Sequence, residues 1–206
     1  FEQLHYLMGM EDCMIAFYEE PEAIKELIDY ITDYELEYAR LVCENYRPDA
    51  LFHHDDWGSY NSTFLSPDMF AEFIMPAYKK IYGFYKSHGV ELIVHHSDSY
   101  AATLVPYMIE MGIDVFQGCV TQNNVPELIK KYGGKISFMG NINNSVVDVP
   151  NWTRELVARE VEKACTECGK LYFIPGLVAG GPGSVYPGVY EAVNEEIQKM
   201  SAKMFV

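Results

Sequence analysis

The chain has 206 residues, of which 15 are Lys or Arg and 30 are Asp or Glu, so its formal charge is −15. Such an acidic chain is a poor partner for a nucleic-acid backbone or an anionic membrane surface, and we expect neither. Apolar residues make up 49% of it, too many for a disordered segment and enough for a packed core. The sequence shows no membrane-length apolar run, no leader pattern and five irregularly spaced cysteines, which predicts a cytoplasmic protein.

Helical and strand patterns alternate along the chain. Apolar residues recur at spacings of three and four after Pro21, which predicts a helix ending near Pro48, and residues 49–54 then form a strand-like run. A second helix begins after Ser66, with a kink or restart at Pro76. The remaining predicted elements are strand 90–95, helix 100–111, strand 113–116, helix 125–132, strand 135–139, helix 153–168, strand 171–174 and a helix from 187 to about 203.

This alternation predicts an α/β fold with a parallel sheet in a single domain that spans residues 1–206. No GxGxxG follows the first strand, so a dinucleotide-binding sheet is not supported. A (β/α)₈ TIM barrel usually needs about 250 residues. Because the chain has about five β/α units and opens on Phe1 rather than Met, we expect the C-terminal part of such a barrel, without its N-terminal strands.

Ligands of parallel α/β proteins bind at the carboxyl ends of the strands. Two of these predicted ends carry paired histidines followed by acids, within residues 53–57 and 95–98. Imidazoles and carboxylates together can carry protons or hold a divalent metal, whereas the alternative is that they cap helices and satisfy loop backbone. The predicted catalytic residues are His54, Asp55, Asp56, His96 and Asp98, and the predicted metal ligands are His96 and Asp98.

Six further residues are predicted to bind substrate. Trp57 and Tyr186 offer aromatic walls, and Gln117 and Asn141 come after the third and fourth strands. The glycine-rich stretch 176–188, which includes Gly180 and Gly181, would let the backbone approach a ligand or would simply form a tight turn. The single motif Cys165-x-x-Cys168 lacks the second ligand pair that a zinc knuckle needs.

Segments across the whole chain resemble the uroporphyrinogen decarboxylase superfamily, and more narrowly its branch related to corrinoid-dependent methyltransferases. The segments are LFHHDDWGSYNSTFLSPDMFAEFIMPAYKKI, GVELIVHHSD, MGIDVFQGC, GGKISFMGNIN and PGLVAGGPGSVYPGVYEAVNEEI. The resemblance implies a (β/α)₈ barrel whose first strands are absent here. It also implies one of two chemistries: decarboxylation of a porphyrinogen without a cofactor, or transfer of a methyl group between a small substrate or corrinoid carrier and a thiol or pterin.

The resemblance further implies zinc, held in related methyltransferases by a His-x-Cys pair and a later Cys. In this chain His96 matches the histidine, Asp98 stands at the first cysteine position and Leu177 at the second. Both thiolates are therefore lost. A His and Asp site would suit a different divalent ion or none.

We expect methyl transfer that involves a methylated small molecule and a corrinoid or pterin carrier, with a corrinoid protein as a candidate partner. The alternatives are uroporphyrinogen decarboxylation, as in porphyrin biosynthesis, and non-catalytic corrinoid or pterin binding. A substrate with many carboxylates calls for Arg or Lys at the strand ends, but the four arginines fall on predicted helices or their ends. We also expect a homo-oligomer, because the edges of an incomplete barrel need covering.

Overall fold

Five short strands form one parallel sheet and follow one another across it in sequence order. The computed structural model describes residues 1–178, 180 and 183–205. The strands are β1 (Ala50–His54), β2 (Leu92–His96), β3 (Val115–Cys119), β4 (Ser137–Ile142) and β5 (Phe173–Leu177). Parallel strands in this order, joined by helices, form part of a TIM-type barrel, so the predicted fold class is confirmed.

The helices precede, connect and follow the strands, and several are short. Before β1 lie α1 (Glu2–Met8), α2 (Met10–Glu19) and α3 (Pro21–Tyr46). Between β1 and β3 lie α4 (Pro67–Met69), the π-helical turn Phe70–Ile74, α5 (Met75–Ser87), the 3₁₀ turn Ala102–Leu104 and α6 (Val105–Glu110). The rest of the chain contains the 3₁₀ turn Thr121–Asn123, α7 (Val125–Tyr132), α8 (Asn144–Val147), α9 (Arg154–Cys168) and α10 (Val189–Met204).

The helix predicted from Ser66 does restart near Pro76. Ser66 caps α4 by accepting a hydrogen bond from the N–H of Met69, a π-helical turn follows, and α5 begins at Met75 with Pro76 in its first turn. Proline lacks an N–H, so the regular helical ladder is interrupted before it. The helices α1 and α2 were not predicted, and neither has a side-chain cap that marks its start.

Four strands begin two residues later than predicted, at Leu92, Val115, Ser137 and Phe173. The glycine after each preceding helix has a positive φ, and these glycines are Gly89, Gly112, Gly134 and Gly169. A left-handed residue turns the chain out of the helix, and further residues are then needed to reach the sheet. As a consequence, Gln117 and Cys119 lie within β3 rather than after it.

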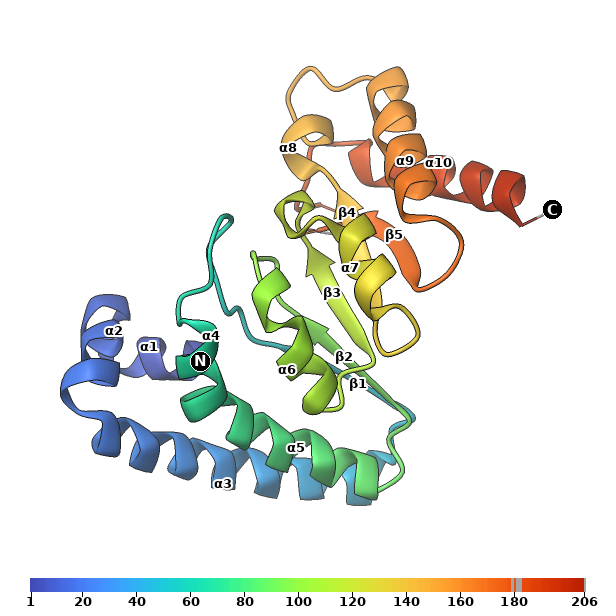
Figure 1. Ribbon diagram of the computed structural model, residues 1–206. Helices are drawn as coiled ribbons and strands as arrows, with labels where there is room; N and C mark the ends of the chain where they lie inside the picture. Colours follow the sequence, from blue (N-terminus) through green and yellow to red (C-terminus); the bar gives the residue numbers. More distant parts are fainter. Residues whose placement is uncertain (179, 181–182, 206) are drawn as a thin grey trace.

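The sheet has one face covered by helices and one open face. The helices follow the strands along one side, from α3 and α5 beside β1 to α9 and α10 beside β5 (Figure 1). Side chains on the covered face are buried, among them Ile93, Phe116, Phe138 and Phe173. On the other face three apolar side chains are exposed: Phe52 by 62%, Leu92 by 40% and Ile174 by 44%. Within the described residues, β1 and β5 each have a strand neighbour on one side alone.

None of the helices in the described part of the chain combines the length and the apolar character that crossing a bilayer requires.

Gly118, inside β3, is the point where the backbone of β3 comes close to the end of β2. Its φ is +89°, and a Cβ there would lie 2.8 Å from the carbonyl oxygen of Ser97. Gly112 has a similar φ of +82° but no atom within 4 Å of the added Cβ. We expect Gly112→Ala to lower the free energy of unfolding by roughly 1 kcal/mol, and Gly118→Ala by about 1–3 kcal/mol more, in urea denaturation. Equal losses for the two variants would show that the close approach is not present.

The predicted homo-oligomer stays a prediction. We expect light scattering to give the mass of a dimer or a larger assembly. A stable monomer at all concentrations would contradict the prediction.

Candidate functional site

The two histidine pairs lie side by side at the carboxyl ends of β1 and β2. The register places His53 opposite His95 and His54 opposite His96. Because successive side chains of a strand point to opposite faces, one histidine of each pair enters the helix-covered side and the other reaches the open face. The four histidines are therefore divided into a pair on the helix-covered side, where His95 is buried and His53 half-buried, and a more accessible pair on the open face.

His95 belongs to the buried side and is fully inaccessible to solvent. Its Nε2 lies 3.1 Å from the carbonyl oxygen of Asp55, and its Nδ1 lies 2.7 Å from the hydroxyl of Tyr82. A carbonyl can accept but not donate, so Nε2 carries the proton and Nδ1 accepts from the tyrosine. Burial, together with the neighbouring His53, lowers the pKa of His95 to about 3, and the ring is therefore neutral.

Asp55 is also buried, and four donors surround its carboxylate. The indole N–H of Trp57, the hydroxyl of Tyr78, the backbone N–H of Glu2 and the amino nitrogen of Phe1 each lie 2.7 Å from it. Burial raises the pKa of Asp55, whereas the hydrogen bonds from the backbone of Glu2 and the hydroxyl of Tyr78 lower it by favouring the charged carboxylate. This carboxylate therefore joins α1, α5 and the end of β1.

Trp57 completes the buried layer. Its ring is 2% exposed and stacks on the ring of His95, with 3.8 Å between the ring centroids. Its backbone N–H donates to the hydroxyl of Ser97. The sequence predicted Trp57 as an aromatic wall of an open pocket and Asp55 as a catalytic residue of the same pocket, whereas the structure places both on the helix-covered side.

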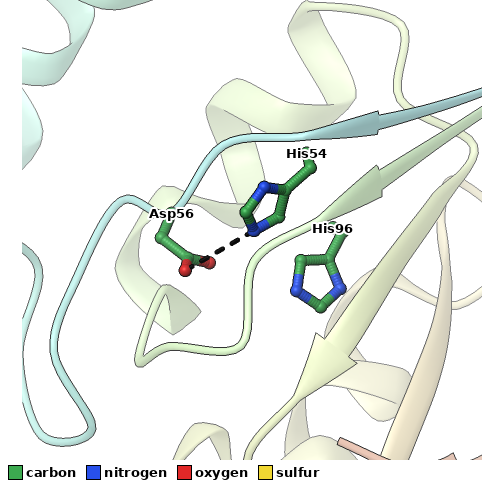
Figure 2. A group of neighbouring side chains, drawn as sticks. All are labelled: His54, Asp56 and His96. Carbon is green, nitrogen blue, oxygen red and sulfur yellow. Dashed lines mark ion pairs between the residues drawn. The ribbon is translucent and has the colours of Figure 1, made fainter. Parts of the chain in front are cut away.

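The accessible side chains at the same strand ends are His54, Asp56 and His96 (Figure 2). His54 Nε2 lies 3.7 Å from Asp56 Oδ2, and the ring centroids of His54 and His96 are 4.7 Å apart. One ligand atom from each of the three residues lies within 4.8 Å of the others. Among the described residues this is the one group of three His, Cys, Asp or Glu side chains close enough to share a metal ion.

Three neighbours hold this cluster in place. Glu2 lies 3.3 Å from His54 Nδ1, His96 Nδ1 donates to the side-chain amide oxygen of Gln117, and the backbone N–H of Asp98 donates to Asp56 Oδ1 at 2.9 Å. Burial and the charge of Asp98 raise the pKa of Asp56. Two of the predicted residues, Gln117 and Asp98, therefore contact the cluster, although the contact from Asp98 comes from its backbone.

A cavity of ≈ 210 Å³ adjoins the cluster on its helical side, between β1 and the helices α1, α3 and α5. His54, a member of the cluster, and Glu2, one of its neighbours, also line this cavity. Most of the remaining lining is apolar, and its polar members include Glu35, whose pKa is raised by burial and by the charge of Asp55. The cluster therefore stands beside a small and largely apolar space.

The other predicted residues lie apart from this cluster. Asn141 has a φ of +63° and donates to the sulfur of Cys168, and it lines a separate polar cavity of ≈ 120 Å³. Gly180 and Tyr186 are exposed, and the N–H of Tyr186 donates to Asp148. Gly181 lies outside the described residues. For Asn141, Gly180 and Tyr186, which the structure describes, no contact with the histidines is seen.

Four residues of this region were missed by sequence reasoning. Glu2 and Glu35 lie in segments without any site pattern, so no signal in the sequence marks them. Tyr78 and Tyr82 stand four residues apart on one face of α5, a spacing that is typical of residues packing in a core. They do pack in the core, but their hydroxyls also bond Asp55 and His95, which the helical spacing alone does not predict.

A zinc ion bound by thiolates, as the resemblance implies for related methyltransferases, does not fit the residues present. The five cysteines are buried, and the thiol of Cys119, at the end of β3, donates to the carbonyl of Phe116. Burial raises the pKa of that thiol, which disfavours the thiolate. Leu177, which ends β5, has no ligand atom in its side chain.

Comparison with known proteins agrees with this fold. A solved structure of a methyltransferase from Methanosarcina mazei superposes with a TM-score of 0.70 at 16% identity, and the match covers 92% of this chain and 53% of that one. Among curated proteins, a methylated-thiol–coenzyme M methyltransferase from Methanosarcina mazei is 26% identical over 179 residues. That match covers 82% of this chain and 46% of the relative, so the chain spans about half the length of the proteins it matches.

The family-level match is more extensive. The model of the uroporphyrinogen decarboxylase family matches residues 1–199, which include all five strands and the whole histidine and carboxylate cluster. The order of elements, the parallel sheet and the polar strand ends agree with that match. The chain belongs to the uroporphyrinogen decarboxylase family.

Proposed function

We propose that this chain is part of a methyltransferase that moves a methyl group between a methylated small molecule and a thiol, with a corrinoid or pterin as carrier. The observation that carries the proposal is the likeness over 82% of the chain to a protein named as a methylated-thiol–coenzyme M methyltransferase. The cluster of His54, Asp56 and His96 lies where such a family member would act, at the carboxyl ends of the strands.

Transfer of a methyl group to a thiol requires the thiolate, because the neutral thiol is a poor nucleophile. The S–H bond breaks and the proton passes to water. The sulfur then forms a bond to the methyl carbon, while the bond from that carbon to its donor atom breaks and leaves its electron pair on the donor. The two imidazoles can donate hydrogen bonds that stabilise the deprotonated sulfur, while the carboxylate of Asp56 can orient an imidazole, and the adjoining apolar cavity has room for a small methyl-bearing group.

Uroporphyrinogen decarboxylation is the competing function, and the charges of the strand ends disfavour it. Its substrate carries many carboxylates, which Arg or Lys side chains bind best. The accessible groups at the ends of β1 and β2 are His54, Asp56, His96 and Asp98, whereas Arg40 and Arg154 form ion pairs with glutamates on helix surfaces. An acidic strand end repels an anionic substrate.

We also propose the compartment in which the protein acts and the protein that delivers the methyl carrier. The five free thiols fit a reducing compartment, which we propose to be the cytoplasm. If the methyl carrier is a corrinoid, the partner that delivers it is a corrinoid protein.

We expect His96→Ala to lower the rate of methyl transfer by ~100-fold or more, because it removes one of two accessible imidazoles from the strand ends. The assay uses an S-methylated thiol as the donor and coenzyme M as the acceptor, and follows the formation of S-methyl coenzyme M by mass spectrometry. His88→Ala is the matched control, since His88 is exposed at the end of α5, outside the cluster, and the activity should be unchanged.

Two further results would contradict the proposal. Conversion of uroporphyrinogen to coproporphyrinogen by the unaltered protein would establish the decarboxylase instead. Tight binding of a corrinoid or pterin with no turnover of any methyl donor would indicate a non-catalytic binding protein.

A further inference from the structure

We propose that His54, Asp56 and His96 form a site for one divalent transition metal ion of the Zn²⁺ type, with two nitrogen ligands and one oxygen ligand. This inference goes beyond the proposed function, because metal binding by these residues does not depend on which group the protein transfers. The proposed ligand set also differs from the thiolate set that the family resemblance implies. His96 belongs to both sets, but the other two proposed ligands come from β1 and the residues after it.

The ligand atoms are already close to one another. One atom from each side chain lies within 4.8 Å of the others, and His54 Nε2 is 3.7 Å from Asp56 Oδ2. Zn²⁺ binds nitrogen and oxygen at ~2.0–2.2 Å in a tetrahedral arrangement, so its ligands lie roughly 3.3 Å apart. The side chain of His54 is 50% exposed and that of Asp56 is 26% exposed, so small rotations can close the cluster around an ion.

Each proposed ligand has its other polar atom held by a neighbour. His54 Nδ1 faces the carboxylate of Glu2, His96 Nδ1 is hydrogen-bonded to the side-chain amide of Gln117, and Asp56 Oδ1 accepts the N–H of Asp98. This leaves His54 Nε2, His96 Nε2 and Asp56 Oδ2 for the ion. Metal-binding histidines almost always have such a partner on the second nitrogen, because it fixes the ring orientation and the tautomer.

The local charge also favours a cation. The carboxylates of Glu2, Asp56 and Asp98 gather around the two imidazoles. In the described part of the chain, the ion-pair partner of both Glu2 and Asp56 is His54 rather than a Lys or Arg. A divalent ion would offset this negative charge.

Two histidines and one carboxylate are a common ligand set for catalytic zinc and for other transition metals with open coordination positions. Three protein ligands leave room for water or for one atom of a bound molecule. The open face of the sheet at this point gives an ion access from solvent, because His54 and Asp56 are both partly exposed.

The test measures Zn²⁺ binding to the full chain by isothermal titration calorimetry, with bound zinc counted by elemental analysis after desalting. We expect one equivalent of Zn²⁺ per chain, and a loss of affinity of ~100-fold or more in each of His54→Ala, Asp56→Asn and His96→Ala. Gln117→Ala should weaken binding by about 10-fold, because it removes the partner of His96 without removing a ligand. Circular dichroism shows whether each variant is folded.

Two controls separate this site from its alternatives. Asp98→Ala keeps the backbone N–H that holds Asp56 and removes only a neighbouring charge, so it should retain the full equivalent of Zn²⁺ with a much smaller loss of affinity than the ligand variants, and His88→Ala should bind as tightly as the unaltered protein. The absorption bands of Co²⁺ in place of Zn²⁺ should show nitrogen and oxygen ligands without the charge-transfer band of a thiolate.

The proposal is overturned if folded His54→Ala and Asp56→Asn retain the full equivalent of zinc at unchanged affinity. It is equally overturned if Asp98→Ala abolishes binding while Asp56→Asn retains it, since His96 and Asp98 would then be the ligands. Failure of methyl transfer with zinc still bound would count against the proposed function and not against this site.

Discussion

The in-register pairing of β1 with β2 is the constraint on which the site depends. It sets His53 beside His95 and His54 beside His96, and the pleat of the strands then directs one pair into the core and the other to the open face. A shift of either strand by one residue would exchange the two pairs and destroy both the buried network and the accessible cluster.

The buried network of Asp55 and His95 stabilises the position of the accessible cluster. Asp55 accepts four hydrogen bonds, and His95 is fixed between Trp57, Tyr82 and the carbonyl of Asp55. Hydrogen bonds to a charged group contribute about 1.5–3 kcal/mol each, so this network is a strong constraint on the segment that follows β1. Because Asp56 and His54 are the immediate neighbours of Asp55 in the chain, their backbone is held by the same network. Asp98, one strand away, then fixes the carboxylate of Asp56.

Much of the fold and part of the site could be predicted from the sequence. Helical spacing, glycine stops and short apolar runs predict five alternating units, and paired histidines followed by acids mark the two strand ends correctly. Which histidine of a pair reaches the open face could not be predicted, because strand alternation alone does not say which face of the sheet the helices will cover.

Long-range contacts account for the remaining differences. Glu2 joins the cluster from more than 50 residues away, through the packing of α1 against the end of β1, and no local pattern encodes that contact. Trp57 was predicted as a pocket wall because it follows a strand end, but its indole N–H bonds a buried carboxylate and its ring stacks on His95. Both contacts depend on the tertiary structure, so neither composition nor periodicity predicts them.

The central claim is that a divalent ion at these strand ends is bound by two imidazoles and a carboxylate and by no thiolate. X-ray absorption spectroscopy at the zinc edge of the zinc-loaded protein tests it most directly. The account predicts a shell of nitrogen and oxygen scatterers at about 2.0–2.1 Å with the multiple-scattering pattern of two histidines. A sulfur shell at about 2.3 Å would contradict it.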